Sequence, residues 1–354
     1  MKPILVTGAT GFLGKHLVRQ LRERQIGPLR LLCRGESIHD SQADLEIVRG
    51  DVTDEASVDA AVRGARAVFH LAGLVSRDPR DRDKLFDVHV NGTRHVCEAA
   101  LRHGVERLVI VSSSGTIAVS GKPIVHTEAS GFARAVTRNW GYYASKIAAE
   151  ELALDLCRGR SLPAVILNPA LLLGPGDDRC SSTGDLVHLF EGQILTYPTG
   201  GMSFVDARDA AAATLAALDR GRTGECYLLG GANWTFKRII QETCRIGGIK
   251  PPRLTSPTPL ARLSAPFLRA VLPAIGRKFT LDDETIQMSG HFWYCDSAKA
   301  APPPVGPASW SKSVWSRLCS RGIHATPPRW PRNFSTRASS ASWPWAAMAP
   351  SAKR

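Results

Sequence analysis

The sequence predicts an α/β protein: a doubly wound parallel sheet with helices on both faces and a small C-terminal cap. Two observations predict this fold class. Short apolar runs alternate with amphipathic stretches up to about residue 230, as in parallel strands that helices bury on both sides. A glycine-rich turn follows the first run, at the end of the strand where such sheets bind ligands.

Seven short apolar runs are predicted to form the strands of this sheet. Between the first two runs, Leu13, Leu17, Val18 and Leu21 recur at helical spacing and define the buried face of a helix. Right-handed crossovers should connect the strands. The predicted strands are residues 4–7, 29–33, 45–48, 67–71, 108–111, 164–167 and 226–229.

The chain divides into two folded parts and a tail. Residues 1–170 and 201–231 carry the alternating pattern and are assigned to the sheet domain. Residues 171–200 and 232–299 are interrupted by Gly, Pro and Ser. We expect them to form the substrate-binding cap, because ligands lie outside the carboxyl ends of the strands in open parallel sheets.

The apolar stretch 259–275 in the cap has two interpretations, a helix that touches a membrane surface or a packed lid segment. Prolines at 257, 259, 266 and 273 disfavour a long continuous helix. A helix on a membrane surface needs an uninterrupted apolar face. We therefore expect the packed lid.

Residues 300–354 differ abruptly from the rest. They contain nine prolines, ten serines, five of the eight tryptophans and no acidic residue, without helical or strand periodicity. The segment is either a basic tail that binds nucleic acid or lipid, or an out-of-frame translation of GC-rich DNA. We favour the second interpretation, and expect the tail to be disordered and to take no part in catalysis.

Charge and composition exclude several classes of protein. Of the net charge of +13, residues 1–299 carry +5 and the tail +8, so nucleic acid is not an expected partner of the main body. No run of eighteen apolar residues and no secretion signal are present, which predicts a cytoplasmic protein without a membrane span. The eight cysteines lack CxxC spacing, so no metal site is expected. The oligomeric state stays open, a homodimer included.

The first candidate site is the turn between the first strand and the first helix. Gly8, Gly11 and Gly14 have the GxxGxxG spacing that permits a tight turn and close approach of a pyrophosphate to backbone N–H groups. Between them lie Thr10, Phe12 and Leu13. In this context the turn predicts a dinucleotide site.

Arg34, after the second strand, bears on the choice of dinucleotide. An acid there would bind the adenosine ribose, whereas an Arg would pair with a 2′-phosphate. Since no acid occurs before Glu36, NADP is favoured, although NAD is an option and Arg34 could be a solvated charge. Asp51 and Val52 are placed to contact the adenine edge, but an Asp after a strand is as often a helix cap.

The fourth strand ends in Leu71, Ala72 and Gly73, whose backbone should pass beneath the cofactor.

A more specific pattern combines a tyrosine, a lysine and a run of serines. Tyr142 and Lys146 lie on one helical face, about 6 Å apart along the axis. The Lys146 ammonium should favour ionisation of the Tyr142 phenol and bring its pKa toward the working range of a proton donor. A serine of the run 112–114 could polarise a carbonyl.

Together these motifs resemble an extended short-chain dehydrogenase/reductase of the NAD-dependent epimerase/dehydratase family. The resemblance covers residues 1 to about 299. Arg34 and the segments 168–170, 174–177, 204–209 and 229–231 are similar to the dihydroflavonol 4-reductase-like group. Hopanoid-associated sugar epimerases and 3β-hydroxysteroid dehydrogenases are neighbouring groups. The sheet domain would then be a Rossmann-like NADP-binding domain.

The resemblance implies roles for individual residues. Tyr142 would be the catalytic acid/base, and Lys146 would hold the nicotinamide ribose. The catalytic serine falls on Ser113, or on Ser114 if the loop is shifted by one. Backbone after Pro169 would face the nicotinamide.

Three functions follow as hypotheses. The leading one is an NADP-dependent oxidoreductase that moves hydride between the nicotinamide and a carbonyl or alcohol carbon of a small-molecule substrate. The second is a nucleotide-sugar epimerase or dehydratase with tightly held cofactor, which the same residues could serve. The third is a non-catalytic NADP-binding protein, which would have no need of the Tyr142 and Lys146 pair.

Overall fold

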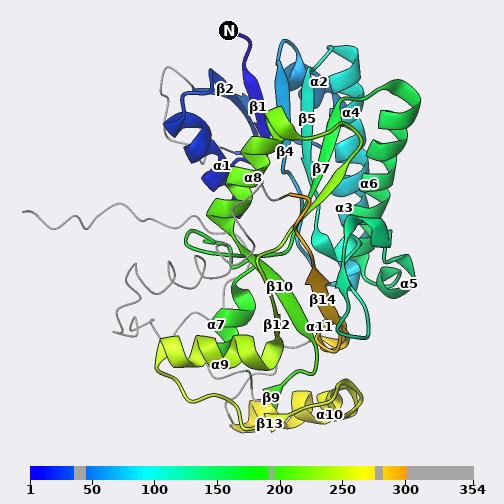
Figure 1. Cartoon of the computed structure of the whole chain (residues 1–354). Helices are drawn as coiled ribbons and strands as arrows, with labels where there is room; N and C mark the ends of the chain where they lie inside the picture. The colour runs from blue at the N-terminus through cyan, green and yellow to red at the C-terminus, as the bar shows by residue number, and fades with distance from the viewer. Residues whose placement is uncertain (36–44, 191–193, 195, 276–281, 301–354) are drawn as a thin grey trace, which may run out of the picture.

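A computed structural model describes residues 1–35, 45–190, 194, 196–275 and 282–300 (Figure 1). The predicted tail beyond Ala300 lies outside these residues. So does Glu36, the acid that follows Arg34 in the sequence. No described helix is both long and apolar enough to cross a membrane.

The main sheet has seven parallel strands in the order β3-β2-β1-β4-β5-β7-β11, which confirms the predicted α/β class. Four strand ends differ from the prediction by one or two residues, because ladder pairing rather than apolar character decides where a strand stops. The strands are β1 Ile4–Thr7, β2 Leu29–Cys33, β3 Leu45–Arg49, β4 Ala67–His70, β5 Arg107–Val111, β7 Ala164–Pro169 and β11 Cys226–Leu229.

Helices cover both faces of this sheet (Figure 1). On one face α1 (Phe12–Glu23) packs against α8 (Ala207–Arg220). On the other face α4 (Gly92–Arg102) lies between α2 (Glu55–Val62) and α6 (Gly141–Arg160) and contacts both. Because side chains alternate along a strand, Ile4 joins the core under α1, whereas Leu5 joins the core under α4. The short helices α3 (Arg82–Phe86) and α5 (Arg134–Thr137) contact α6.

A second sheet stands beyond the carboxyl ends of these strands. Its order is β12-β10-β14-β6, and β8 pairs with β10, while β9 and β13 pair separately. The sequence places residues 201–206 in the sheet domain, but they form β10 of this second sheet, since their ladder partners are β8, β12 and β14. The strands are β6 Val125–His126, β8 Leu171–Leu173, β9 Thr196–Tyr197, β10 Gly201–Asp206, β12 Ala232–Thr235, β13 Leu254–Thr255 and β14 Phe292–Cys295.

Helices α7 (Gly184–Phe190), α9 (Phe236–Gly247), α10 (Thr258–Val271) and α11 (Asp283–Met288) complete this region. The packed lid expected around α10 was wrong in two respects. A helix of 14 residues forms despite its prolines, since Pro259 lies in the first turn, whose N–H groups have no partner within a helix, and Pro266 removes one bond. In addition, Ala265 is the one side chain of α10 that is buried.

Candidate active site

A cavity of about 670 Å³ opens at the carboxyl ends of the main strands and brings most predicted site residues together. It lies where β2 and β4 flank β1, the point at which strand order reverses and such sheets bind ligands. Asp51, Val52 and Ala72 are not among its lining residues. The predicted residues that line it are Gly8, Thr10, Gly11, Phe12, Leu13, Gly14, Arg34, Leu71, Gly73, Ser113, Tyr142, Lys146 and Pro169.

The turn between β1 and α1 requires its glycines. Gly8 has a φ of +73°, and a Cβ there would lie 2.6 Å from the Ala72 nitrogen. A Cβ on Gly14 would lie 2.2 Å from the Gly8 carbonyl oxygen. Gly11 caps α1 without a side-chain hydrogen bond, so the N–H groups of the first turn remain available for a phosphate. The turn therefore fits the pyrophosphate of a dinucleotide.

Arg34 follows β2 and lines this cavity. Its side chain is 70% exposed, and the Asp51 carboxylate lies 3.8 Å away. Asp51 accepts hydrogen bonds from the backbone and hydroxyl of Thr53. The alternative interpretation of Asp51 as a helix cap was wrong, because Asp54 caps α2. Val52 is buried.

The backbone after β4 is held against the end of β1. Ala72 donates its N–H to the Thr7 hydroxyl at 3.2 Å. The Thr7 hydroxyl also contacts His70 Nδ1 at 2.8 Å. Burial lowers the pKa of His70 to about 3, so this imidazole is neutral. Leu71 and Gly73 are thereby fixed beneath the cavity.

Tyr142, Lys146 and Ser113 line the same cavity. Tyr142 and Lys146 follow one another by one turn of α6, and the buried Lys146 Nζ donates to the Val111 carbonyl at 3.2 Å. Ser113 follows β5 and lines the cavity beside Tyr142, whose pKa its side chain lowers. Ser114 also lines the cavity, but the effect on Tyr142 favours Ser113 over this alternative.

The pKa of Tyr142 runs opposite to the expectation from the sequence. Burial raises it to about 12, and the Ser113 side chain offsets part of this rise. Burial also lowers the pKa of Lys146 to about 8. Because desolvation disfavours the charged form of both groups, Tyr142 is protonated at neutral pH and is prepared to donate a proton.

Glu150 lies on the same face of α6 as Tyr142 and Lys146, and the sequence interpretation missed it. It lies one turn beyond Lys146, is buried, and accepts hydrogen bonds from the Ser112 hydroxyl and from Asn168 Nδ2 at 2.9 Å. Burial raises the pKa of Glu150, while its negative charge raises that of Lys146. The i, i+4 spacing from Lys146 was the signal that could have identified it.

His89 is a second residue that was missed, and a lone histidine in a helix gives no signal for it. Its Nε2 accepts the Leu74 N–H at 3.1 Å, so Nδ1 carries the proton and donates to the Ser145 hydroxyl at 2.8 Å. Ser145 in turn donates to the Tyr142 carbonyl at 2.8 Å. Burial lowers the pKa of His89 to about 2. His89 thus connects the loop after β4 to the first turn of α6.

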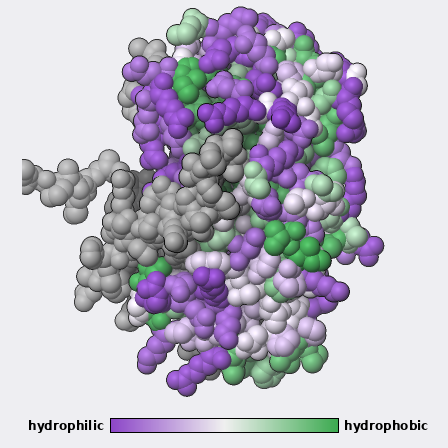
Figure 2. Space-filling model, in the orientation of Figure 1, coloured by the Kyte–Doolittle hydropathy of each residue, from purple (hydrophilic) through white to green (hydrophobic). Residues whose placement is uncertain are grey.

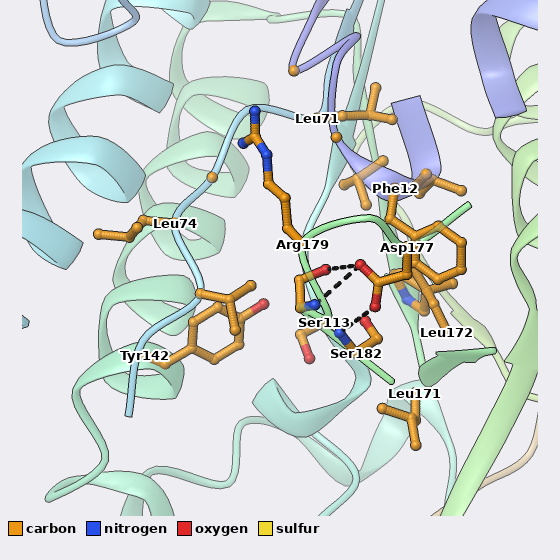
Figure 3. Close-up of a pocket in the computed structure, with 18 of the residues that line it drawn as sticks. Phe12, Leu71, Leu74, Ser113, Tyr142, Leu171, Leu172, Asp177, Arg179 and Ser182 are labelled. Atoms are coloured by element: carbon orange, nitrogen blue, oxygen red, sulfur yellow. Dashed lines mark hydrogen bonds between the residues drawn. The ribbon is translucent and has the colours of Figure 1, made fainter. Parts of the chain in front are cut away.

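A loop after β8 forms the opposite wall. The Asp177 carboxylate accepts hydrogen bonds from Ser181, Ser182 and Thr183, which closes the loop on itself (Figure 3). An ion pair between Asp178 and Lys15 attaches the loop to α1. Figure 3 shows Tyr142 on one side of the cavity and Phe12 with Leu172 on the other.

The part of the cavity beside the second sheet has both apolar and polar walls, with Ser76, Arg77, Asp185 and His188 among its polar residues and a group of five apolar ones. Leu74, Val75, Leu171, Met202 and Trp293 line it, from the loop after β4 and from the second sheet. At its rim, Arg77 forms an ion pair with Asp185 at 3.2 Å across the two regions.

Residues 4–230 match the model of the NAD-dependent epimerase/dehydratase family. The chain belongs to this family. Members of the family and its named relatives are NAD(P)-dependent reductases, dehydrogenases, epimerases and dehydratases, so the chain is an enzyme of this kind.

Three comparisons place the chain more closely. A Synechocystis protein provisionally named dihydroflavonol 4-reductase is 33% identical over 83% of this chain and 87% of its own length. Sterol demethylase protein B of Methylococcus capsulatus is 35% identical over 81% of this chain and 88% of its own length. The crystal structure of gox2253 aligns with a TM-score of 0.71, at 30% identity over 91% of this chain and 99% of that one.

Proposed function

We propose that this enzyme is an NADP-dependent oxidoreductase that transfers hydride between the nicotinamide and a carbonyl or alcohol carbon of an apolar small molecule. The observation that carries the proposal is the placement of Tyr142 beside Ser113 and Lys146, in the same cavity as the glycine turn. The relatives named for reduction of a flavonoid and for sterol metabolism agree with an apolar substrate.

Each residue has a distinct task in this mechanism. The first turn of α1 would hold the pyrophosphate, Lys146 the nicotinamide ribose, and the backbone at Pro169 would face the ring. When bound, the cofactor supplies or accepts hydride at C4 of its nicotinamide. Ser113 would hydrogen-bond the substrate oxygen, and Tyr142 would donate its proton to that oxygen as the carbonyl is reduced.

The raised pKa of Tyr142 supports the reductive direction, since the phenol begins protonated. Once the proton has left, the Lys146 ammonium would stabilise the phenolate. The apolar side chains of the cavity wall beside the second sheet would contact the apolar part of a ketone or aldehyde.

The deciding experiment incubates the enzyme with NADPH and separate panels of apolar ketones, aldehydes and nucleotide sugars. We expect stoichiometric loss of NADPH absorbance together with formation of the alcohol. Stereochemical conversion of a nucleotide sugar without net NADPH consumption would establish an epimerase instead. Tight NADPH binding without turnover of any panel member would favour a non-catalytic role.

Replacing Arg34 by Asp should reverse the preference between the two dinucleotides. Hydrogen bonds to charged groups contribute about 1.5–3 kcal/mol, so NADPH affinity should fall at least about tenfold while NADH affinity is kept or improved. Calorimetric titration of both cofactors measures this. Arg24→Asp, an exposed change beyond the end of α1, is the matched control and should alter neither affinity. Equal affinities in the unmodified enzyme would contradict the assignment of NADP.

A further inference from the structure

The outer face of α10 is apolar and open to solvent. Leu260, Leu263, Phe267 and Val271 follow at intervals of three, four and four residues, so they form one stripe along the helix. Leu263 is 80% exposed and Phe267 67% exposed. Leu254 of the adjacent strand β13 is 70% exposed.

These five side chains lie at one end of the molecule. Figure 2 shows hydrophobic residues gathered at the lower end, where Figure 1 places α10 and β13, remote from the main sheet. Single exposed apolar residues are common on protein surfaces, whereas a contiguous apolar patch indicates a binding surface. We call these residues the α10 patch.

The charge around the patch identifies its partner. Residues 248–271 contain four basic side chains, Lys250, Arg253, Arg262 and Arg269, and no acidic one. All four are exposed. Helix α11, which packs against α10, begins with Asp282, Asp283 and Glu284. Arg269 pairs with Asp283 at 2.7 Å, while Asp282 and Glu284 interact electrostatically with Arg77 at the cavity rim. Lys250, Arg253 and Arg262 remain as positive charges near the apolar stripe.

From this combination we propose that the α10 patch docks on an anionic lipid bilayer, with α10 lying in the plane of the interface. Exposed leucine and phenylalanine side chains would enter the boundary between headgroups and acyl chains, while the basic residues would attract anionic headgroups. A second copy of the chain fits less well, since joining two such patches would bring like charges together. The inference is independent of the proposed function.

Flotation of the full-length chain with lipid vesicles tests this proposal. Vesicles of phosphatidylglycerol and phosphatidylcholine should bind the protein, and vesicles of phosphatidylcholine alone should bind it at least about tenfold more weakly, since each basic residue near an anionic surface contributes about 1 kcal/mol. High salt should reduce binding, because it screens exposed charges.

Leu263→Gln/Phe267→Gln should weaken binding to the anionic vesicles at least about tenfold, given the area of apolar surface removed from the interface. Arg253→Glu/Arg262→Glu should weaken it by a similar factor. Ile124→Gln, an exposed apolar residue in another part of the fold, is the matched control and should bind as the unmodified chain does. Circular dichroism and NADPH titration verify that each variant is folded.

Three results would overturn the proposal. The first is no binding of the unmodified chain to anionic vesicles. The second is equal binding by Leu263→Gln/Phe267→Gln, which would place the lipid contact elsewhere, for example in the basic residues 300–354. The third is a dimer, detected by light scattering, that this double variant dissociates while vesicle binding stays absent, which would make the α10 patch a contact between copies.

Discussion

Tyr142→Phe should lower kcat by about 10²- to 10⁴-fold, the usual value of a positioned acid. The variant loses one hydroxyl, which is the group that donates the proton in the proposed reaction. Its ring still packs edge-on against His89 at a centroid distance of 5.5 Å, so the fold and NADPH affinity should be retained. Steady-state kinetics with NADPH and the ketone identified as substrate measure the loss.

Tyr143→Phe provides the matched control for this experiment. Tyr143 is adjacent in sequence, but its ring packs against Trp293 at 4.9 Å and Trp140 at 6.2 Å, and it is not among the cavity-lining residues. Loss of the Tyr143 hydroxyl should change kcat by only a few-fold. A nearly inactive Tyr143→Phe beside an active Tyr142→Phe would show that the assignment of the proton donor is wrong.

Acidification from about pH 6.5 to pH 5 should destabilise the fold by up to about 4 kcal/mol through His70 and His89. Their pKa values in the folded chain are lowered to about 3 and about 2, against about 6.5 in an unfolded chain. Below pH 6.5 the unfolded state therefore binds two protons that the folded state excludes. The contribution of the two neutral imidazoles to the free energy of unfolding is fully present above pH 6.5. As the pH decreases toward the pKa values of the folded state, the free energy of unfolding falls by up to about 2.7 kcal/mol per pH unit.

Urea denaturation at several pH values measures this slope. His70→Gln/His89→Gln removes both titrating groups, so its stability should be lower at pH 7 but nearly constant between pH 6.5 and 5. His95→Gln, on α4, should retain the slope of the unmodified chain. If the double variant loses stability with acid as steeply as the unmodified protein, other groups cause the acid sensitivity.

The parts of the site that were predictable are those whose chemistry is local in sequence. The glycine turn can be recognised because Gly8, Gly11 and Gly14 act through backbone geometry within seven residues. Tyr142 and Lys146 share one helix, so their spacing alone places them together. The sheet domain followed in the same way from strands and helices that alternate along the chain.

The parts that were missed depend on contacts between distant segments. His89 acts through Leu74 and Ser145, which no local pattern joins. The placement of β10 in the second sheet depends on pairing with β12 and β14. The pKa of Tyr142 could not be anticipated from the charge of Lys146, because burial is a property of the assembled fold.

The loop after β8 has a consequence for the rate at which cofactor is exchanged. It lines the same cavity as the glycine turn, and its first half is attached to α1 by the Asp178–Lys15 ion pair and by a contact of His16 Nε2 with the Pro175 carbonyl at 2.9 Å. A dinucleotide in that cavity would therefore be enclosed between α1 and the loop. Its departure would require both attachments to break, so residence time and affinity can be set by different residues of the same chain.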